Sequence, residues 1–310
     1  IYKFRGANIY NILNFENVFT GAKVIKLEQN YRSTQTILNA ANAVISNNIG
    51  RKSKSLWTDN GEGEKVNYTL YENGYDEAEG VASGIAEYVR DGWNYNDVAI
   101  LYRTNAQSRA LEEKLMIHNI PYKIYGGQNF YQRKEIKDIL AYLKTIDNGL
   151  DGQAVKRIIN VPKRGIGNTT IDRLQEYADF NDITFWEALV NAKDIDTIKN
   201  AALSKLEPFV DLIGRLRAKE EFMSLKELAE AVIEDTGYIE SLSQNETVEE
   251  VEARRENLDE FINKVVSYEE SCKEAGEEPT LSGLLEEVAL IADIDNLDES
   301  EPHVMLMTLH

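Results

Sequence analysis

The apolar positions of this chain follow two different patterns along its length. From Val24 to Ile124, short runs of β-branched and aromatic residues alternate with stretches of helical periodicity. This alternation predicts parallel strands joined by helices, because parallel strands need a crossover connection that is usually a helix. From Arg133 to about Asp293 the strand signal almost disappears, and apolar residues recur at the spacing of amphipathic helices.

The two patterns predict an α/β domain interrupted by a helical one. In the first region we expect strands at 24–27, 66–70, 98–102 and 122–125, and helices at 34–47, 76–90 and 106–118. In the second region we expect helices at 134–146, 169–181, 225–235, 248–271 and 281–292. Strand character returns at 304–309. The expected domains are therefore an α/β part at 1–132, an all-helical insert at 133–300, and a return to the α/β part at 301–310.

Length and composition are those of a globular chain with about two domains. The chain has 310 residues, of which 43% are hydrophobic and 28% charged. Its single cysteine, Cys272, excludes a disulfide framework and a cysteine-based zinc site, and it favours a cytoplasmic location. There is no apolar run of membrane-spanning length and no signal peptide, so no membrane contact is expected. The first residue is not Met, and we expect a fragment of a longer protein.

The net charge of −19 argues at first against a nucleic-acid partner, because binding to phosphates is driven by Lys and Arg. The acidity is concentrated in one region. Residues 244–302 contain 19 acidic and 4 basic side chains, which leaves a net charge of only −4 for the rest. A solvated helical face accounts for such a charge run. The rest of the chain therefore remains compatible with a nucleic-acid partner.

A polar turn at 28–34, Glu-Gln-Asn-Tyr-Arg-Ser-Thr, follows the first expected strand and precedes a helix that Ser33 or Thr34 can cap. Ligands of open α/β sheets bind beyond the carboxyl ends of the strands. The fork-shaped cation of Arg32 suits the charge that develops on a transferring phosphoryl group, and Tyr31 could stack on a base. The alternative is that Arg32 forms a structural ion pair, which is the commoner role of an arginine at a strand end.

A second loop, 163–170, lies in the helical region and contains two glycines. Gly165 and Gly167 suit a tight turn, and Thr169 could cap the following helix. Backbone N–H groups at such a helix start can bind a phosphate without reading sequence. Lys163 and Arg164 would add positive charge. The alternative is a simple turn between helices.

The turn at 29–34 resembles motif IV of the superfamily-one DNA helicases of the UvrD, Rep and PcrA group. Other stretches are similar to further signatures of this group. Residues 1–7 resemble the tail of motif III, and 305–310 resemble the opening of motif V. Similar signature stretches occur at 101–109, 130–138 and 161–167, so the resemblance covers essentially the whole chain.

This resemblance implies a truncated RecA-like second motor domain with an all-helical inserted domain. The parent would be an ATP-dependent DNA helicase that moves 3′ to 5′ along single-stranded DNA and unwinds duplexes in repair or replication. ATP and Mg²⁺ would be its cofactors. The chain itself contains no Gly-x-x-x-x-Gly-Lys-Ser/Thr loop and no strand-linked Asp-Glu pair. We therefore expect no bound cofactor, no metal ligands and no ATP hydrolysis from this chain alone.

The resemblance also implies roles for individual residues. Arg32 would be the catalytic arginine, and Tyr31 would pack on the adenine. The single strand would be lined by Tyr2, Phe4, Arg5, Arg103, Asn105, Thr308 and His310. The duplex would be contacted by Lys163, Gly165, Ile166 and Gly167.

Two other hypotheses stay open. The chain could be a non-catalytic regulatory module that binds DNA or protein, with the acidic region 244–302 docking basic partners. It could also be the helicase part of a repair nuclease subunit. The expected partners are single-stranded and duplex DNA, together with protein partners of the helical insert.

Overall fold

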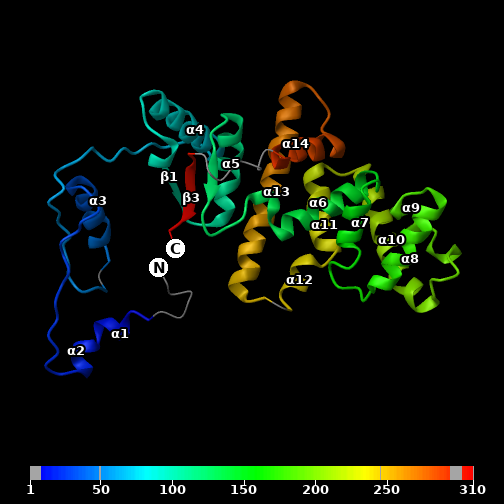
Figure 1. Ribbon diagram of the computed structural model, residues 1–310, viewed down its shortest axis with the longest axis horizontal. Helices are drawn as coiled ribbons and strands as arrows, with labels where there is room; N and C mark the ends of the chain where they lie inside the picture. The colour runs from blue at the N-terminus through cyan, green and yellow to red at the C-terminus, as the bar shows by residue number, and fades with distance from the viewer. Residues whose placement is uncertain (1–7, 49, 245, 294–301, 310) are drawn as a thin grey trace. The chain divides into compact units, whose positions relative to one another are not determined.

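The computed structural model describes residues 8–48, 50–244, 246–293 and 302–309 (Figure 1). The chain divides into two compact units, one made of Ile1–Glu72 and His310 and the other of Asn73–Leu309. Among the described residues only the second unit contains a β-sheet.

The described residues of the first unit form the helices α1 (Tyr10–Leu13), α2 (Phe15–Val18) and α3 (Gln35–Ser46). Helix α3 confirms the helix expected at 34–47. Thr34 occupies its N-cap position, but its side chain makes no capping hydrogen bond. Instead, the first backbone N–H groups of α3 donate to the carbonyls of Gly61 and Glu62 at 2.8 and 3.0 Å. A neighbouring loop therefore satisfies the start of the helix.

The strands expected at 24–27 and 66–70 are wrong for this structure. Both segments lack regular secondary structure, and most of their apolar side chains are exposed. A strand needs a neighbouring strand to satisfy its backbone N–H and C=O groups, and neither segment has one among the described residues. The nearest equivalent is a single parallel bridge between Gln29 and Trp57.

The sheet of the second unit is parallel, as predicted. Its strands are β1 (Ala99–Tyr102), β2 (Tyr122–Ile124) and β3 (Val304–Thr308), in the order β1–β3–β2. Tyr102 lies opposite Thr308, and Ile124 lies opposite Leu306. The strand nearest the end of the chain therefore lies between two strands that precede it by about 180 residues or more.

Two helices complete the core around this sheet. Helix α4 (Gly74–Arg90) packs against α5 (Ser108–Ile117). Asn73 caps α4 by accepting two backbone N–H bonds at 2.9 Å each. Ile85 of α4 and Leu115 of α5 belong to the buried cluster that includes the apolar side chains of the strands. The helices expected at 76–90 and 106–118 are thus confirmed, the second after a short 3-10 turn, η3 (Asn105–Gln107).

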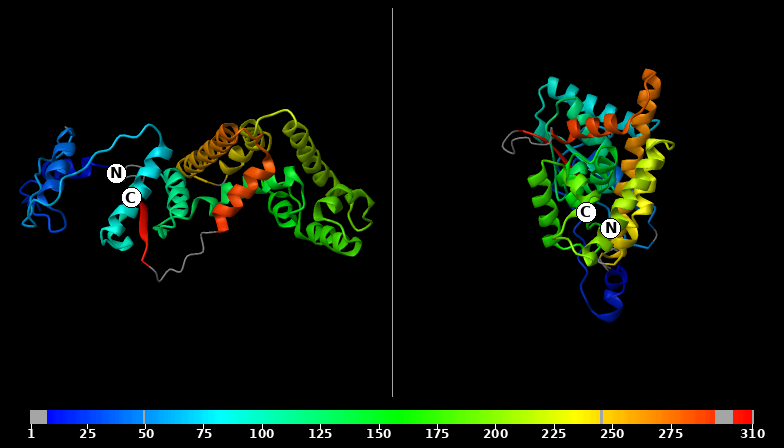
Figure 2. Two further views of the ribbon diagram at one scale, coloured as in Figure 1. Left: turned by 90° about the horizontal axis from the view of Figure 1, so that it is seen from above. Right: turned by 90° about the vertical axis from the view of Figure 1, so that its right-hand side faces the viewer.

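The described residues from 134 to 293 form a helical body beside the sheet (Figure 2). Its helices are α6 (Lys134–Asp147), α7 (Gly152–Ile158), α8 (Asn168–Asn181), α9 (Phe185–Val190), α10 (Asn200–Glu220), α11 (Leu225–Asp235), α12 (Tyr238–Leu242), α13 (Val248–Ala275) and α14 (Leu281–Asp293). They surround one large apolar cluster, to which α6 contributes the fully buried Tyr142. All of the helices expected here are confirmed, whereas α7, α9, α10 and α12 were not anticipated.

The long helix α13 shows how the sequence sets its limits. Thr247 and Glu250 form a reciprocal capping box at its start. Gly276 ends it with a φ of +74°, in the left-handed region where glycine is favoured. None of the helices in the described ranges combines the length and apolar character that crossing a bilayer requires.

Candidate nucleotide and nucleic-acid contacts

Asn30 shapes the turn that carries Tyr31 and Arg32. Its Oδ1 accepts hydrogen bonds from the backbone N–H groups of Arg32 and Ser33 at 3.0 and 2.8 Å. In addition, Asn60 Nδ2 donates to the carbonyl of Tyr31 at 3.2 Å. Side chains of this kind commonly close such turns on the backbone. The backbone of the turn is thus held in place.

The side chains of Tyr31 and Arg32 both face solvent. Tyr31 is 80% exposed, and its hydroxyl donates to Gln29 Oε1 at 3.0 Å. Within the described ranges, the Arg32 guanidinium forms no ion pair or hydrogen bond. The structural ion pair considered as an alternative is therefore absent from those residues. The turn presents a planar cation next to an aromatic ring, which together suit a phosphate and a base.

Three of the expected DNA-contacting residues meet at the carboxyl edge of the parallel sheet. Arg103 and Asn105 follow β1, and Thr308 ends the neighbouring β3 opposite Tyr102. Parallel neighbours end at the same edge of a sheet, and this is the edge where ligands of open α/β sheets bind. The fold therefore brings together residues that lie about 200 positions apart in the sequence.

Tyr125 lies at the same edge and was missed in the sequence. It follows β2, and its backbone N–H donates to the carbonyl of Leu306 at 2.8 Å. Its side chain is 70% exposed. Gly126 comes next with a φ of +73°, which turns the chain sharply. An aromatic residue between a strand and a glycine pair was the signal that could have identified it.

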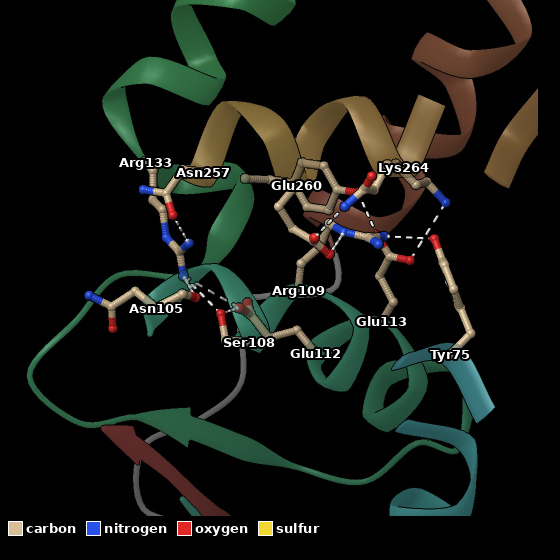
Figure 3. A network of polar contacts seen from close by, with 12 residues as sticks. Tyr75, Asn105, Ser108, Arg109, Glu112, Glu113, Arg133, Asn257, Glu260 and Lys264 are labelled. Carbon is tan, nitrogen blue, oxygen red and sulfur yellow. Dashed lines mark hydrogen bonds and ion pairs between the residues drawn. The ribbon is translucent and has the colours of Figure 1, made fainter. Parts of the chain in front are cut away.

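Arg133 ties the loop after β1 to the helical body (Figure 3). Its Nη2 donates to the Asn105 carbonyl at 3.0 Å and to Ser108 Oγ at 2.8 Å, and its Nη1 donates to Asn257 Oδ1 on α13 at 2.8 Å. Burial lowers the pKa of Arg133, although the carboxylate of Glu112 partly opposes this effect. The backbone of Asn105 is therefore held by a buried side chain.

Arg109 forms a second buried link between α5 and α13 (Figure 3). It is only 1% exposed, and it donates to Glu113 at 3.0 Å, to Glu260 at 2.8 Å and to the Tyr75 hydroxyl at 3.0 Å. Burial by itself lowers the pKa of Arg109, but the carboxylates of Glu113 and Glu260 outweigh it and raise the pKa above its usual value. Lys264 Nζ lies 3.6 Å from Glu113 Oε2. No structural role for Arg109 was anticipated.

Asn160 and Lys205 hold the loop that precedes α8. Asn160 Oδ1 accepts from the backbone N–H of Arg164 at 2.8 Å, and its Nδ2 donates to the carbonyl of Ile166 at 3.2 Å. Lys205 Nζ donates to the carbonyl of Gly165 at 2.8 Å. Gly165 has a φ of +71°, where other residues are strained. The loop therefore has one defined conformation.

The expectation that Arg164 adds charge to this loop is wrong. Its guanidinium points into the helical body, where it donates to the Ile158 carbonyl at 2.9 Å and to the Tyr142 hydroxyl at 2.7 Å. It also lies 4.9 Å above the Phe209 ring. Lys163 is exposed. Lys163 therefore faces solvent, whereas Arg164 is half-buried. Its guanidinium binds the carbonyls of Ile158 and Ile159 at the end of α7.

The remaining residues of the loop differ in what they expose. Gly165 and Gly167 are exposed, whereas Ile166 is 4% exposed and packs in the apolar cluster. Only the backbone of Ile166 can therefore meet a ligand. Helix α8 begins at Asn168 with Gly167 in the N-cap position, so the expectation that Thr169 caps it is wrong.

Four of the expected DNA contacts, Tyr2, Phe4, Arg5 and His310, lie outside the described residues and stay predictions. In the described ranges, no group of three or more His, Cys, Asp or Glu side chains is arranged to hold a metal ion.

Comparison with known proteins identifies the family of the chain. The model of the UvrD-like helicase C-terminal domain matches residues 25–310, and the chain belongs to this family. The whole chain is 48% identical to the ATP-dependent DNA helicase PcrA of Staphylococcus aureus (strain Mu50 / ATCC 700699). It is 46% identical to the ATP-dependent DNA helicase PcrA of Staphylococcus epidermidis (strain ATCC 12228 / FDA PCI 1200). In both comparisons all 310 residues align, and they span 42% of the relative.

Proposed function

We propose that the full-length protein is an ATP-dependent DNA helicase that moves 3′ to 5′ along single-stranded DNA and separates duplexes. This chain would supply part of a RecA-like second motor domain, residues 1–132 and 301–310, and an inserted helical domain, residues 133–300. The proposal is supported by membership of the UvrD-like family and by the names of the PcrA relatives. The helicase activity of those relatives comes to this chain by inference.

The observation that carries the proposal is the exposed guanidinium of Arg32 on a turn that hydrogen bonds hold in place. Its five N–H donors match phosphate oxygens, and it forms no ion pair among the described residues. Such an arginine would stabilise the charge that develops during phosphoryl transfer without being rearranged first. Tyr31 offers an exposed ring for the base of the nucleotide.

ATP and Mg²⁺ would need further groups that this chain does not contain. The sequence has no phosphate loop, and residues elsewhere in the full-length protein would hold the β- and γ-phosphates and the ion. Arg32 would contribute only to the transition state. We therefore infer that the 310-residue chain by itself hydrolyses no ATP.

The carboxyl edge of the sheet would carry the single strand. Arg103 would contact phosphates there, and Asn105 and Thr308 would add neutral hydrogen bonds. Tyr125 would offer a stacking surface that accepts any base. Such contacts bind without reading sequence, as an enzyme that moves along DNA requires.

The loop before α8 would contact duplex DNA. Exposed backbone at Gly165 and Gly167 and the side chain of Lys163 suit phosphates and not base edges. The buried Arg133 and Arg109 links would keep the sheet edge and the helical body in register while both bind the same forked substrate.

The test is Arg32→Ala in the full-length protein. We expect DNA-stimulated ATP turnover to fall by about 10³-fold or more, as on loss of an arginine finger, while affinity for single-stranded DNA is kept. Arg32→Lys should also be impaired, because it keeps the charge and loses the fork. Arg90→Ala, at an exposed ion pair on α4, is the matched control and should turn over normally. Unchanged turnover in Arg32→Ala would remove the central support for the assignment.

A further inference from the structure

A groove on the helical body is lined by apolar and basic side chains, and it contains none of the residues proposed to contact DNA. It lies between α6, α7 and α14 and encloses about 540 Å³. This volume is within the range of roughly 300–1,000 Å³ that is typical of ligand-binding pockets. The floor is aliphatic and is formed by Leu140, Ala141, Ala154, Leu285, Val288 and Ala289.

Four cations also line the groove, and we call them its basic rim. They are Lys137, Lys144, Lys156 and Arg157, against the single lining carboxylate of Asp151. In a chain with a net charge of −19, this is a local reversal of sign. A basic rim around an apolar floor complements a ligand that is both acidic and apolar.

The cations of the rim are only partly neutralised by their neighbours. Lys144 lies 3.3 Å from Asp151, and Arg157 Nε lies 2.7 Å from Asp138. Lys137 has no carboxylate partner among the described residues. The rim therefore retains positive charge.

Lys156 and Asp151 are held in place by other contacts. Lys156 Nζ lies 5.2 Å from the centre of the Phe185 ring. Burial alone raises the pKa of Asp151, but backbone N–H bonds from Ala154 and Gln153 and the contact with Lys144 outweigh it and lower the pKa. Asp151 is thus engaged in capping α7 and in holding Lys144.

The floor favours a peptide over a nucleic acid. Single-stranded nucleic acids bind through aromatic stacking, and the one aromatic residue of this groove, Tyr131, is only 4% exposed. Its hydroxyl is directed to Glu113 at 2.7 Å. A phosphodiester chain has no apolar groups of its own that could pack on the aliphatic floor and remove it from water. An amphipathic helix would do so with residues spaced three and four apart.

The surroundings of the groove differ from those of a second cavity on the same body. That cavity, near α11 and α13, is lined by Glu230, Glu234, Glu240 and Asp259 as well as by Lys226 and Arg255. Acidic side chains outnumber basic ones in its lining, so it has no basic rim. The second cavity therefore lacks the excess of basic over acidic lining residues that the groove between α6, α7 and α14 has.

We propose that this groove is a docking site for an acidic amphipathic helical segment of a partner protein. Apolar residues of one helix face would pack on Leu140, Leu285 and Val288, and flanking Glu or Asp side chains would meet Lys137 and Lys156. The groove is used by neither the arginine turn nor the sheet edge. The proposed docking site is therefore independent of the helicase function proposed above.

The experiment selects ligands from a displayed library of helical peptides with randomised surface positions, with the full-length protein as bait. A peptide from the selection is then labelled, and its affinity is measured by fluorescence anisotropy. We expect selected peptides to be acidic and amphipathic, and Lys137→Glu to weaken binding by about tenfold or more. The matched control, Lys226→Glu, reverses an exposed lysine at the second cavity and should bind normally.

Reversing the charge on both the peptide and the groove distinguishes specific docking from nonspecific binding. A peptide whose acidic residues are replaced by lysine should bind Lys137→Glu more tightly than it binds the unchanged protein. The proposal is overturned if the library yields no binder, if binders lack acidic residues, or if Lys137→Glu and Lys226→Glu behave alike. It is also overturned if duplex or single-stranded DNA displaces the labelled peptide from Lys226→Glu as effectively as the unlabelled peptide does. The occupant of the groove would then be nucleic acid.

Discussion

Arg109 Nε on α5 and Glu260 Oε1 on α13 lie 2.8 Å apart, although 151 residues separate them in the sequence. The same guanidinium also binds Glu113, which in turn lies 3.6 Å from Lys264. These charges are largely removed from water and depend on one another. Loss of one member leaves the remaining buried charges only partly compensated, which is more costly than loss of an exposed pair.

We therefore expect Arg109→Met to lower the free energy of unfolding by about 3–5 kcal/mol, mainly because the buried carboxylate of Glu113 loses its closest cation and keeps only Lys264 at 3.6 Å. Urea unfolding followed by circular dichroism measures this change. Arg90→Met removes an exposed pair with Glu87 on α4 and should stay within about 0.5 kcal/mol of the unchanged protein. If the two variants unfold alike, the buried network contributes no more than a surface ion pair.

Substitutions of the neighbouring residues Lys163 and Arg164 should change different properties, namely duplex affinity for Lys163 and the free energy of unfolding for Arg164. Lys163→Ala should leave the unfolding free energy unchanged and weaken duplex binding, with the slope of log affinity against log salt reduced by about 1. Arg164→Ala should lower stability by about 2–4 kcal/mol, because several backbone carbonyls and the buried Tyr142 hydroxyl lose their donor. Salt-dependent DNA titrations and urea unfolding of both variants measure the contrast. A stable Arg164→Ala with a reduced salt slope would place this side chain on the DNA side instead.

Substitutions at Gly165 and Gly167 distinguish the effect of the loop's backbone conformation from that of direct contact with DNA. Gly165 has a φ of +71°, so Gly165→Ala should cost about 1–2 kcal/mol and disturb the loop. Gly167 has a φ of −85°, and nothing lies within 4 Å of a Cβ added there. Gly167→Ala should therefore fold normally and lower duplex affinity only if DNA approaches that backbone closely. Normal duplex binding by Gly167→Ala would exclude such a close approach.

The sequence predicted most of the fold because its strands and longest helices carry strong periodic patterns. The parallel sheet, α3, α6 and α13 are where the pattern indicated them. The strands expected at 24–27 and 66–70 fail because strand formation depends on a neighbour, which no local pattern reports. Helix α10 was missed, and Pro208 inside it is a residue that normally ends a helical pattern.

For the candidate sites, the sequence indicated which residue types were present, but it did not show which way they point. Arg32 and Arg164 both lie in loops that resemble family motifs, yet Arg32 is exposed whereas Arg164 is half-buried with its guanidinium bound to Tyr142. The difference depends on partners distant in the sequence, such as Phe209 beneath Arg164. Arg103, Asn105 and Thr308 could be grouped by family resemblance, but the shared sheet edge follows only from the strand order.

The last prediction concerns pH and a carboxylate on α4. Hydrogen bonds from Lys114 and His118, at 2.9 and 2.7 Å, lower the pKa of Glu79 from 4.5 to about 2. A carboxyl with a lowered pKa in the folded state stabilises the protein above its unfolded pKa, and this contribution is lost as pH falls from about 4.5 towards 2. Because the Glu79 side chain is 43% exposed, solvent screening limits the contribution to about 1 kcal/mol or less.

The difference in unfolding free energy between the unchanged protein and Glu79→Gln should therefore shrink as pH falls from about 4.5 towards 2. Urea unfolding at a series of pH values measures this difference. Glu87→Gln is the control, because Glu87 is 70% exposed and lies 3.6 Å from Arg90, so its removal should change little at any pH. A Glu79→Gln difference that stays the same from about pH 6 to pH 3.5 would mean that Lys114 and His118 do not hold the ionised carboxylate in solution, because the lowered pKa requires the difference to shrink over that interval.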